Sequence, residues 1–496
     1  MQYRFFFLIL LFLPGWIFAQ TSDFDLSSYK LPNLKRHSLE TTIDLYGQNQ
    51  YAQYITSNDF NSQESWNHNL SGNSSLRYLS YLNTSDEQTE SEMGVKLYNN
   101  LNKQSSPDEW KSTYGQFIPS LWVKQNRRKY AGSPAFTEMG LLLDYSYMRT
   151  KFSQSGDYYS NIKDLLHVNS LQMIVPVKFG SGRIEQVQDA RHAIYLVDEL
   201  TQAGRFNGTV TNDEIIRFAE LISQLKNERF FDARHHMIHE LEVVDSFLLA
   251  NGYATQRDAR YFSVLQDYWR YGSVITRMSG HRFSFAFYPG IFAFDMKGYS
   301  KGSFNILPFG KQALLAGFIH AGPEIVYEKP IGLAWQNSVA LYVTGGFTLG
   351  KFRDFELDED SKMRFPLLEA GFSNTFGYYP NTRTSVNFHY ACNGIKIFDS
   401  GEETGDILGT EVTGIRGSAG LEINYYISPQ LRLNFSSSLS YQWQDSPDYF
   451  PIDLAARTSS GSFLNVATRT IIDDYFTYYS RNFSHKFQLS FLYSLF

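Results

Sequence analysis

The strongest constraint on the fold is a two-residue alternation of apolar and polar side chains that recurs through the second half of the chain. In residues 431–444 the apolar side chains share one parity, and they are Leu431, Leu433, Phe435, Leu439, Tyr441 and Trp443. A period of two is that of a β-strand, whose successive side chains point to opposite faces. The same pattern recurs in 335–351, 383–398 and 412–427, so the sequence predicts a large sheet with one apolar and one polar face.

Two folds use strands of this kind: a soluble β-sandwich with its apolar face inward, and a closed barrel with lipid outside and water inside. Connection lengths favour the barrel. Compact Pro-containing turns, such as 327–334 and 378–384, alternate with long polar connections, such as 353–363 and 399–411. A transmembrane barrel places short turns at one membrane face and long loops at the other, whereas a sandwich gives no reason for the alternation.

Composition agrees with a barrel and gives no support for a nucleic-acid-binding protein. Aromatic residues make up 17% of the 496 residues, yet the mean hydropathy is only -0.32. A barrel explains both values, because every second residue faces a polar lumen. The net charge of -6 gives no support for a nucleic-acid partner, and a single cysteine, Cys392, can form no internal disulfide.

The N-terminus has the features of a secretory signal. Arg4 precedes an apolar run from Phe5 to Leu13, and the small residue Ala19 lies where cleavage would occur. The alternative is a membrane anchor, but the run is short beside the roughly 20 residues of a spanning helix. Residues 1–19 are therefore predicted to be a cleaved signal peptide, and 20–36 an N-terminal extension.

The alternation gives way to a helical period between residues 183 and 272. Apolar residues recur three or four apart in the first of four expected helices: Val187, Ala190, Ile194, Val197 and Leu200. Thr211 and Glu214 predict a capping box at the start of the second helix. The fourth helix is expected to face inward with Ala259, Phe262, Leu265 and Trp269. Residues 183–272 are therefore predicted to be an inserted helical domain.

Strands are expected on both sides of this insertion. Residues 273–496 hold eight candidates, near 278–297, 312–327, 335–351, 364–379, 383–398, 412–427, 431–445 and 483–496. Residues 37–182 form a first β region with six weaker candidates. The prediction is a mainly β protein, an antiparallel transmembrane β-barrel of about fourteen strands. The alternative is an eight-stranded barrel preceded by a separate β region.

The chain resembles a known class of proteins in several short stretches. The "FAQ" end of the signal, the Tyr/Asn/Gln-rich strands and the "YEKP" turn resemble outer-membrane barrels of the Bacteroidota. The stretch "GSGRIEQVQDARHAIYLVDEL" is similar to a recurring element of their uncharacterised members, and the aromatic last strand resembles that of bacterial outer-membrane proteins, except that Phe496 lies on its polar parity. The resemblance implies the outer membrane of a Gram-negative bacterium. With the C-terminus on the periplasmic side, the helical domain is expected in the periplasm.

Two sets of residues have the chemistry of metal ligands. His235 and His239 stand one helical turn apart, a spacing that suits a metal but equally a polar helix surface. The second set is an acidic loop containing Asp354, Glu356, Asp358 and Asp360. Its oxygens could hold Ca²⁺ or bridge lipopolysaccharide through divalent cations, and a solvated acidic loop is the simpler interpretation. No cofactor is expected.

The polar faces of the strands would line the lumen of the barrel. Their candidate lining residues are His320, Glu324, His389, Arg416, Glu422 and Arg432. These side chains could set the selectivity of a pore, or pair with one another and fill a closed lumen.

Three classes of function follow from this architecture. The chain could be a channel or transport component, a structural or assembly protein with a closed lumen, or a lipid-modifying enzyme embedded in the outer membrane. No spacing joins a histidine to a nucleophile, so the chain is expected not to be an enzyme. The expected partners are outer-membrane lipid, including lipopolysaccharide, and a periplasmic protein bound through 183–271.

Overall fold

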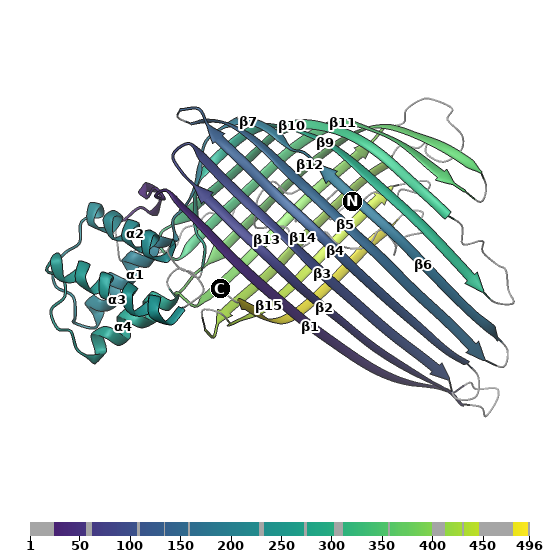
Figure 1. Ribbon diagram of the computed structural model, residues 1–496, viewed down its shortest axis with the longest axis horizontal. Helices are drawn as coiled ribbons and strands as arrows, with labels where there is room; N and C mark the ends of the chain where they lie inside the picture. The colour runs from purple at the N-terminus through teal and green to yellow at the C-terminus, as the bar shows by residue number, and fades with distance from the viewer. Residues whose placement is uncertain are drawn as a thin grey trace, which may run out of the picture.

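The long alternating stretches form strands of one antiparallel sheet in the computed structural model (Figure 1). The structure describes residues 24–55, 62–106, 110–132, 134–156, 159–227, 233–271, 275–301, 311–355, 358–398, 412–428, 431–445 and 480–494. The expected signal peptide, residues 1–19, lies outside this range.

Six long strands precede the helices and eight follow them. The first group is β1 (Leu34–Ile55), β2 (Ser62–Asn83), β3 (Glu87–Ser106), β4 (Trp110–Tyr130), β5 (Ala135–Gly156) and β6 (Tyr159–Ile174). The second is β9 (Met278–Lys301), β10 (Lys311–Ile331), β11 (Trp335–Asp354), β12 (Glu359–Tyr378), β13 (Thr384–Ile397), β14 (Val412–Tyr426), β15 (Leu431–Asp445) and β16 (Ser480–Ser494).

These fourteen strands close into a ring. Each strand pairs with the next within its group, β6 pairs with β9 across the helical insertion, and β16 pairs with β1. The expected barrel of about fourteen strands is confirmed, and both β regions belong to it. Closure satisfies the hydrogen-bonding groups that an open sheet would leave at its edges.

Two short strands interrupt this simple pattern. After β6, Val175 and Pro176 break the ladder, and β7 (Val177–Ser181) then continues between β5 and β9. Proline has no amide hydrogen to give to the ladder, but its carbonyl still accepts a bond from the Gly140 amide at 2.8 Å. The next strand, β8 (Ile184–Gln186), pairs with β9, so the first helix begins later than the expected boundary at residue 183.

Side chains on the outer wall are apolar and those on the inner wall are mixed. On β10, Leu315 and Ile319 are 60% and 53% exposed, whereas Leu314 and Glu324 are each 4% exposed. The same outward parity exposes Leu45, Leu70, Met93, Leu121, Met139, Phe285, Leu349, Phe388, Ile415 and Leu439 on other strands. The described outer surface of the barrel is therefore rich in side chains that water solvates poorly.

The helices lie at the end of the barrel where compact turns join the strands (Figure 1). Those turns are 84–86, 131–134, 332–334, 379–383 and 427–430. At the other end the connections include 302–310, 398–411 and 446–479, but β3–β4 and β5–β6 are joined only by 107–109 and 157–158. In the second half, β11 and β12 are joined only by 355–358, so the long connection predicted at 353–363 is wrong, and the alternation of short and long connections holds only in part.

Four helices form the inserted segment: α1 (Gln188–Gln202), α2 (Asn212–Asn227), α3 (Ala233–Ala250) and α4 (Ala259–Tyr271). The capping box before α2 is confirmed. The Thr211 amide donates to Glu214 Oε2 at 2.8 Å, and the Glu214 amide donates to Thr211 Oγ1 at 3.4 Å. Among the described residues, no helix has the length and apolar character needed to cross a membrane.

The helices share a core with residues that precede β1. A short 3₁₀ helix, η2 (Leu26–Ser28), brings Phe24, Leu26 and Tyr29 into this core, where each is at most 2% exposed. No such role was predicted for the N-terminal extension, residues 20–36. Its contribution is that of a fifth packing element, which ties the start of the barrel to the helices.

The predicted inward face of α4 is wrong in the first half of the helix, where the buried side chain lies one residue before the predicted one. Tyr261, Leu265 and Trp269 are fully buried, while Ala259 and Phe262 are exposed. Tyr261 can be buried because its hydroxyl donates to Asp245 Oδ1 at 2.9 Å, which satisfies its polar atom. The face therefore follows an exact four-residue spacing from the tyrosine.

Candidate functional site

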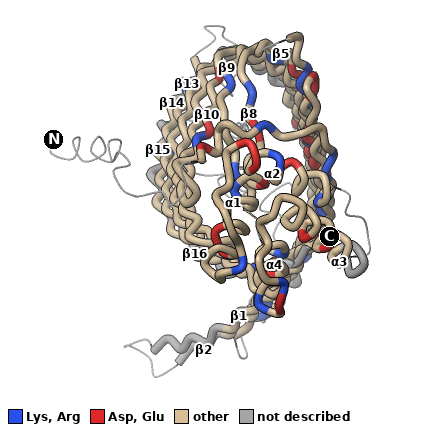
Figure 2. Tube along the Cα trace, turned by 90° about the vertical axis from the view of Figure 1, so that its left-hand side faces the viewer, with Lys and Arg blue, Asp and Glu red and all other residues tan. Residues whose placement is uncertain are grey.

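The helical segment covers one end of the barrel. The helices lie beyond the ends of the strands in Figure 1, and α1 and α2 lie in front of the interior of the ring when the molecule is viewed from that end (Figure 2). We call residues 188–271 the cap. Every residue from Gln188 to Ile194 is buried, so the first half of α1 is enclosed on all sides between the other helices and the barrel.

Arg191 of α1 joins the cap to two turns of the barrel. Its Nε donates to the main-chain carbonyl of Leu333 at 3.1 Å. Its Nη2 donates to the carbonyls of Tyr379 and Asn381 at 3.3 Å and 3.1 Å. The guanidinium is fully buried and lies over the ring of Tyr195, 4.7 Å from its centroid. One side chain thus spans the β10–β11 and β12–β13 turns.

Arg277, just before β9, binds the same turn from the other direction. It donates to the carbonyls of Leu333 at 2.6 Å and Trp335 at 2.5 Å, and to Gln336 Oε1 at 2.9 Å. Burial, and the nearby Arg191 guanidinium, lower the pKa of Arg277 to about 9. Two like charges are therefore held together by main-chain oxygens, which replace the water that each guanidinium would otherwise bind.

Further contacts extend the attachment around the rim. Asp267 of α4 forms an ion pair with Arg383 at the β12–β13 turn. The Tyr271 hydroxyl donates to the carbonyl of Ile427 at 3.1 Å, at the β14–β15 turn. Arg183, before α1, donates to the carbonyls of Ser85 and Thr84 at 2.8 Å and 2.7 Å, at the β2–β3 turn. The segment from 183 to 271 therefore contacts four turns of the ring.

A buried polar chain links the cap to the first strand. Asp189 of α1 pairs with Arg36 of β1 at 2.5 Å and accepts a bond from Ser223 of α2. Ser223 is in turn bonded to the Tyr29 hydroxyl at 2.8 Å. The aspartate is fully buried, so loss of Arg36 would leave an uncompensated charge inside the protein.

Opposite charges alternate along the inner wall near the capped end. Lys178 of β7 lies 2.7 Å from Glu324 of β10 and 3.8 Å from Glu138 of β5. Glu138 also pairs with Arg128 of β4, and Glu324 accepts a bond from the Tyr288 hydroxyl. These four charged side chains are nearly buried, and together they carry no net charge. We call them the inner-wall cluster; they neutralise one another across five neighbouring strands.

The hydrogen bonds of Arg277 extend into the inner wall. Gln336, which accepts from Arg277, donates to Glu328 Oε2 at 3.1 Å, and the same carboxylate accepts from the Ser338 hydroxyl. A displacement of Arg277 would therefore alter the hydrogen bonds of a carboxylate on the inner wall.

The structure places all six expected lumen residues on the inward parity of their strands, in two separate groups. His320 and Glu324 are buried on β10. His389, Arg416, Glu422 and Arg432 lie on β13, β14 and β15, on the far side of β11 and β12. In this second group, Glu422 accepts from Asn434 at 2.7 Å and Arg432 donates to the Tyr426 hydroxyl at 3.2 Å. Only Glu324 belongs to the inner-wall cluster.

The candidate metal ligands do not converge in the part that is described. Asp358 and Asp360 pair with Arg353 at 3.3 Å and 3.7 Å, and Asp354 accepts from Gln312 at 3.0 Å. Glu356 and the side chain of His235 lie outside the described residues, and His239 is exposed on α3. Within the described residues no three His, Cys, Asp or Glu side chains are grouped as metal ligands.

Most of the residues that attach the cap to the barrel, and most of the inner-wall cluster, were not predicted from the sequence. The sequence analysis singles out none of Arg191, Arg277, Arg128 and Lys178. One signal was present: Glu138 places a charge on the polar face of a strongly alternating strand. Its partners could not be chosen, because alternation gives the face of each residue and not the register in which β4, β5 and β7 pair.

Comparisons with known proteins assign no family. No protein-family model matches the chain, and no curated protein matches it. Among solved structures it is similar to the translocator domain of the autotransporter NalP from Neisseria meningitidis, at 7% identity and a TM-score of 0.22, covering 84% of each chain. It is also similar to the transport unit of the autotransporter AIDA-I from Escherichia coli, at 10% identity and a TM-score of 0.25, covering 79% of this chain and 90% of that one.

A third similar structure is a variant of the TodX monoaromatic hydrocarbon channel, at 7% identity and a TM-score of 0.30, covering 84% of this chain and 89% of that one. Identities and TM-scores this low are not evidence for a function. The barrel itself is established directly, by the strand pairing.

Proposed function

We propose that this chain is an outer-membrane β-barrel that acts as a channel or transport component, with the cap controlling access to its lumen. The outer wall supports the membrane location. Soluble monomers rarely expose large contiguous apolar patches, and the outward parity of this barrel is apolar on strand after strand. Lipid is the surrounding that makes such a wall favourable, and the ring closes where Glu40 and Thr41 of β1 pair with Ser494 and Tyr493 of β16.

The orientation and origin of the chain are part of the same proposal. A cleaved signal over residues 1–19 would export the chain, and the compact turns together with the cap would face the periplasm, as short turns do in bacterial barrels. The protein would be of the Bacteroidota type and would not be an enzyme. A periplasmic protein would bind the segment 183–271.

The observation that carries the gating role is the attachment of the cap by main-chain hydrogen bonds. Arg191 and Arg277 hold the β10–β11 turn without an ion pair to a carboxylate among the described residues. Such an attachment can be lost and remade without unfolding either part, because water can replace the guanidinium at each carbonyl. The polar inner wall supplies the lining that a solute pathway needs.

Conductance of the purified full chain in a planar bilayer tests this proposal. The comparison is between the native protein and the double variant Arg191→Met and Arg277→Met, with Arg205→Met as control. Arg205 pairs with Asp258 inside the cap at 2.6 Å, and its side-chain hydrogen bonds among the described residues all stay within the cap. We expect low conductance from the native chain and the control, and a higher open probability from the double variant.

Two outcomes would count against the proposal. Equal, low conductance of all three proteins would refute a passage controlled by the cap, and a barrel with a permanently closed lumen would then be the better description. A full-size conductance of the native chain that the double variant leaves unchanged would keep the channel and remove the gate.

A further inference from the structure

The outer wall carries a row of unpaired cations at the end of the barrel opposite the cap. They are exposed on four successive strands: Lys103 on β3, Lys111 on β4, Arg149 and Lys151 on β5, and Lys163 on β6. None of these five forms an ion pair with a carboxylate within the described residues. Arg149 and Lys151 follow the apolar outward residues Leu141, Leu143 and Tyr145 of the same strand.

The opposite side of the same end has a different arrangement. There, Lys351 pairs with Asp360 at 2.8 Å, and Arg353 lies within 3.3 Å of Asp358 and 3.7 Å of Asp360. The cations of β11 are therefore neutralised by the chain itself. Those of β3 to β6 present positive charge to whatever surrounds the barrel.

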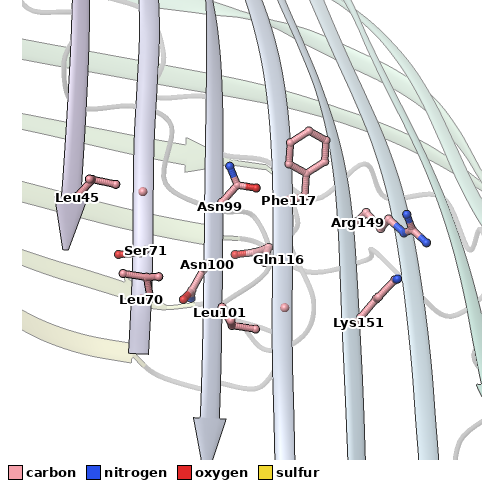
Figure 3. A pocket seen from close by; sticks show the side chains of 12 residues that line it. Leu45, Leu70, Ser71, Asn99, Asn100, Leu101, Gln116, Phe117, Arg149 and Lys151 are labelled. Carbon is pink, nitrogen blue, oxygen red and sulfur yellow. The ribbon is translucent and has the colours of Figure 1, made fainter. Parts of the chain in front are cut away.

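A shallow groove of about 520 Å³ runs from these cations across the outer wall (Figure 3). The outward residues that line it are Leu45, Leu70, Gly72, Asn99, Leu101, Gly115, Phe117, Arg149 and Lys151. Arg149 and Lys151 lie at one side of the groove and Leu45 at the other (Figure 3). Glycine creates the depression, because a Cβ added at Gly115 would meet no atom within 4 Å.

The two sides of the groove lie at different depths along the barrel. Pairing joins Leu45, Gly72, Asn99, Phe117 and Arg149 into one row across β1 to β5. The strands are tilted against the long axis (Figure 1), so each step along this row from β1 moves away from the capped end. The apolar side of the groove is thus nearer the middle of the barrel, and the cationic side is nearer the uncapped end.

We infer that this groove binds a phosphorylated lipid, with its phosphate on Arg149 and Lys151 and an acyl chain over the apolar side. Arginine and lysine match the charge of a phosphate, and arginine can bind two of its oxygens together. The depth of each side matches a lipid that lies along the wall, with its headgroup at the edge of the bilayer. This inference rests on the proposed outer-membrane orientation, in which the uncapped end meets the outer leaflet. The occupant is then lipopolysaccharide.

Equilibrium binding of fluorescent lipopolysaccharide to the detergent-solubilised full chain tests the site. The charge variant is Arg149→Gln with Lys151→Gln. Its matched control is Lys351→Gln with Lys362→Gln, which removes two exposed cations that face one another across β11 and β12 at the same end. Each basic residue near an anionic lipid surface contributes about 1 kcal/mol, so the charge variant, which loses two, should bind about 30-fold more weakly. The control should bind as the native chain does.

A second variant tests the groove without changing its charge. Gly115→Phe fills the depression, and its backbone φ is not in the left-handed region, so the strand should tolerate it. We expect this variant also to weaken binding of lipopolysaccharide, while leaving the affinity for inorganic phosphate unchanged.

The other outcomes overturn the inference. Native-like binding by the charge variant, or an equal loss in the control, would mean that no specific phosphate site exists at Arg149. Equal affinity for phosphatidylglycerol would remove the choice of lipopolysaccharide, and competition by millimolar inorganic phosphate alone would identify a free anion as the ligand. Failure of the gating proposal is separate, because a protein that is silent in the planar bilayer would still bind the lipid in detergent.

Discussion

Replacement of Arg191 by methionine should weaken the docking of α1 on the β10–β11 and β12–β13 turns while leaving the cap and the barrel folded. Methionine keeps an unbranched apolar stem, so the packing of the arginine methylenes over Tyr195 is largely retained. Of the four hydrogen bonds that it removes, three cross from α1 to barrel turns, at 3.1, 3.3 and 3.1 Å, and the fourth, to the Tyr195 hydroxyl at 3.2 Å, lies within α1. Each is charge-assisted, but the carbonyls regain water when the cap opens.

The size of the effect follows from these bonds. At about 1 kcal/mol net for each, the central value for a hydrogen bond within a protein, the loss is about 3 kcal/mol. Since 1.4 kcal/mol is tenfold, the population of the open cap should rise about 150-fold. Relief of the repulsion between Arg191 and Arg277 acts in the opposite direction, so this figure is an upper estimate.

Hydrogen exchange in detergent measures that population locally. Amides near the β10–β11 and β12–β13 turns should exchange faster in the variant, whereas amides in the middle of β10 should not. Arg205→Met is the control, because its ion pair with Asp258 lies within the cap. Less than threefold faster exchange at the two turns, or the same change in the control, would show that Arg191 does not hold the cap.

Four further predictions concern neighbouring parts of the molecule. Thr211→Ala should lower the free energy of unfolding of the cap by about 1 kcal/mol, measured by chemical denaturation. Hydrogen bonds from Thr211 lower the pKa of Glu214 to about 2, so this carboxylate stabilises α2 above pH 4 to 5. Its contribution to the stability of the cap should fall progressively as the pH drops towards 2. A cap stability that stays constant over this pH range would contradict the prediction. Phe24→Ala should cost about 3 to 5 kcal/mol in the same assay and expose the start of β1 to protease, because the ring is buried in the cap core. Lys178→Met should be more destabilising to thermal unfolding than the double change with Glu324→Gln, because the single change leaves a buried carboxylate without its 2.7 Å partner; equal melting temperatures would argue that the pair is not coupled.

Local patterns predicted the parts of this fold that local physics determines. Alternation fixed which side chains of β10 and β15 point outward, and the capping box at Thr211 was identified from a four-residue pattern. Both depend only on neighbours in the sequence. The fourteen-strand ring followed from counting alternating segments, eight after the helices and six before them, which requires no knowledge of side-chain contacts.

What escaped prediction depends on contacts between distant segments. Lys178 and Glu324 meet because β7, β9 and β10 pair in a particular register, which joins segments far apart in the sequence. Phe24 and Tyr29 show no helical or strand period, so nothing local indicated that they complete the core of the cap. Tyr261 is absent from the predicted inward face of α4 because its hydroxyl counts as polar until its partner Asp245 is known.

The meeting of Arg191 and Arg277 at the carbonyl of Leu333 has a consequence for how this protein can change. Every residue, proline and glycine included, offers the same main-chain carbonyl oxygen, so the identity of the side chain at 333 matters little to the two arginines. What they require is the path of the backbone through Gly332, whose φ of 63° is a conformation that glycine adopts without strain. The docking of the cap therefore depends on the backbone conformation of the β10–β11 turn. A single β-branched residue at 332 should disturb it more than any exchange at 333 or 334.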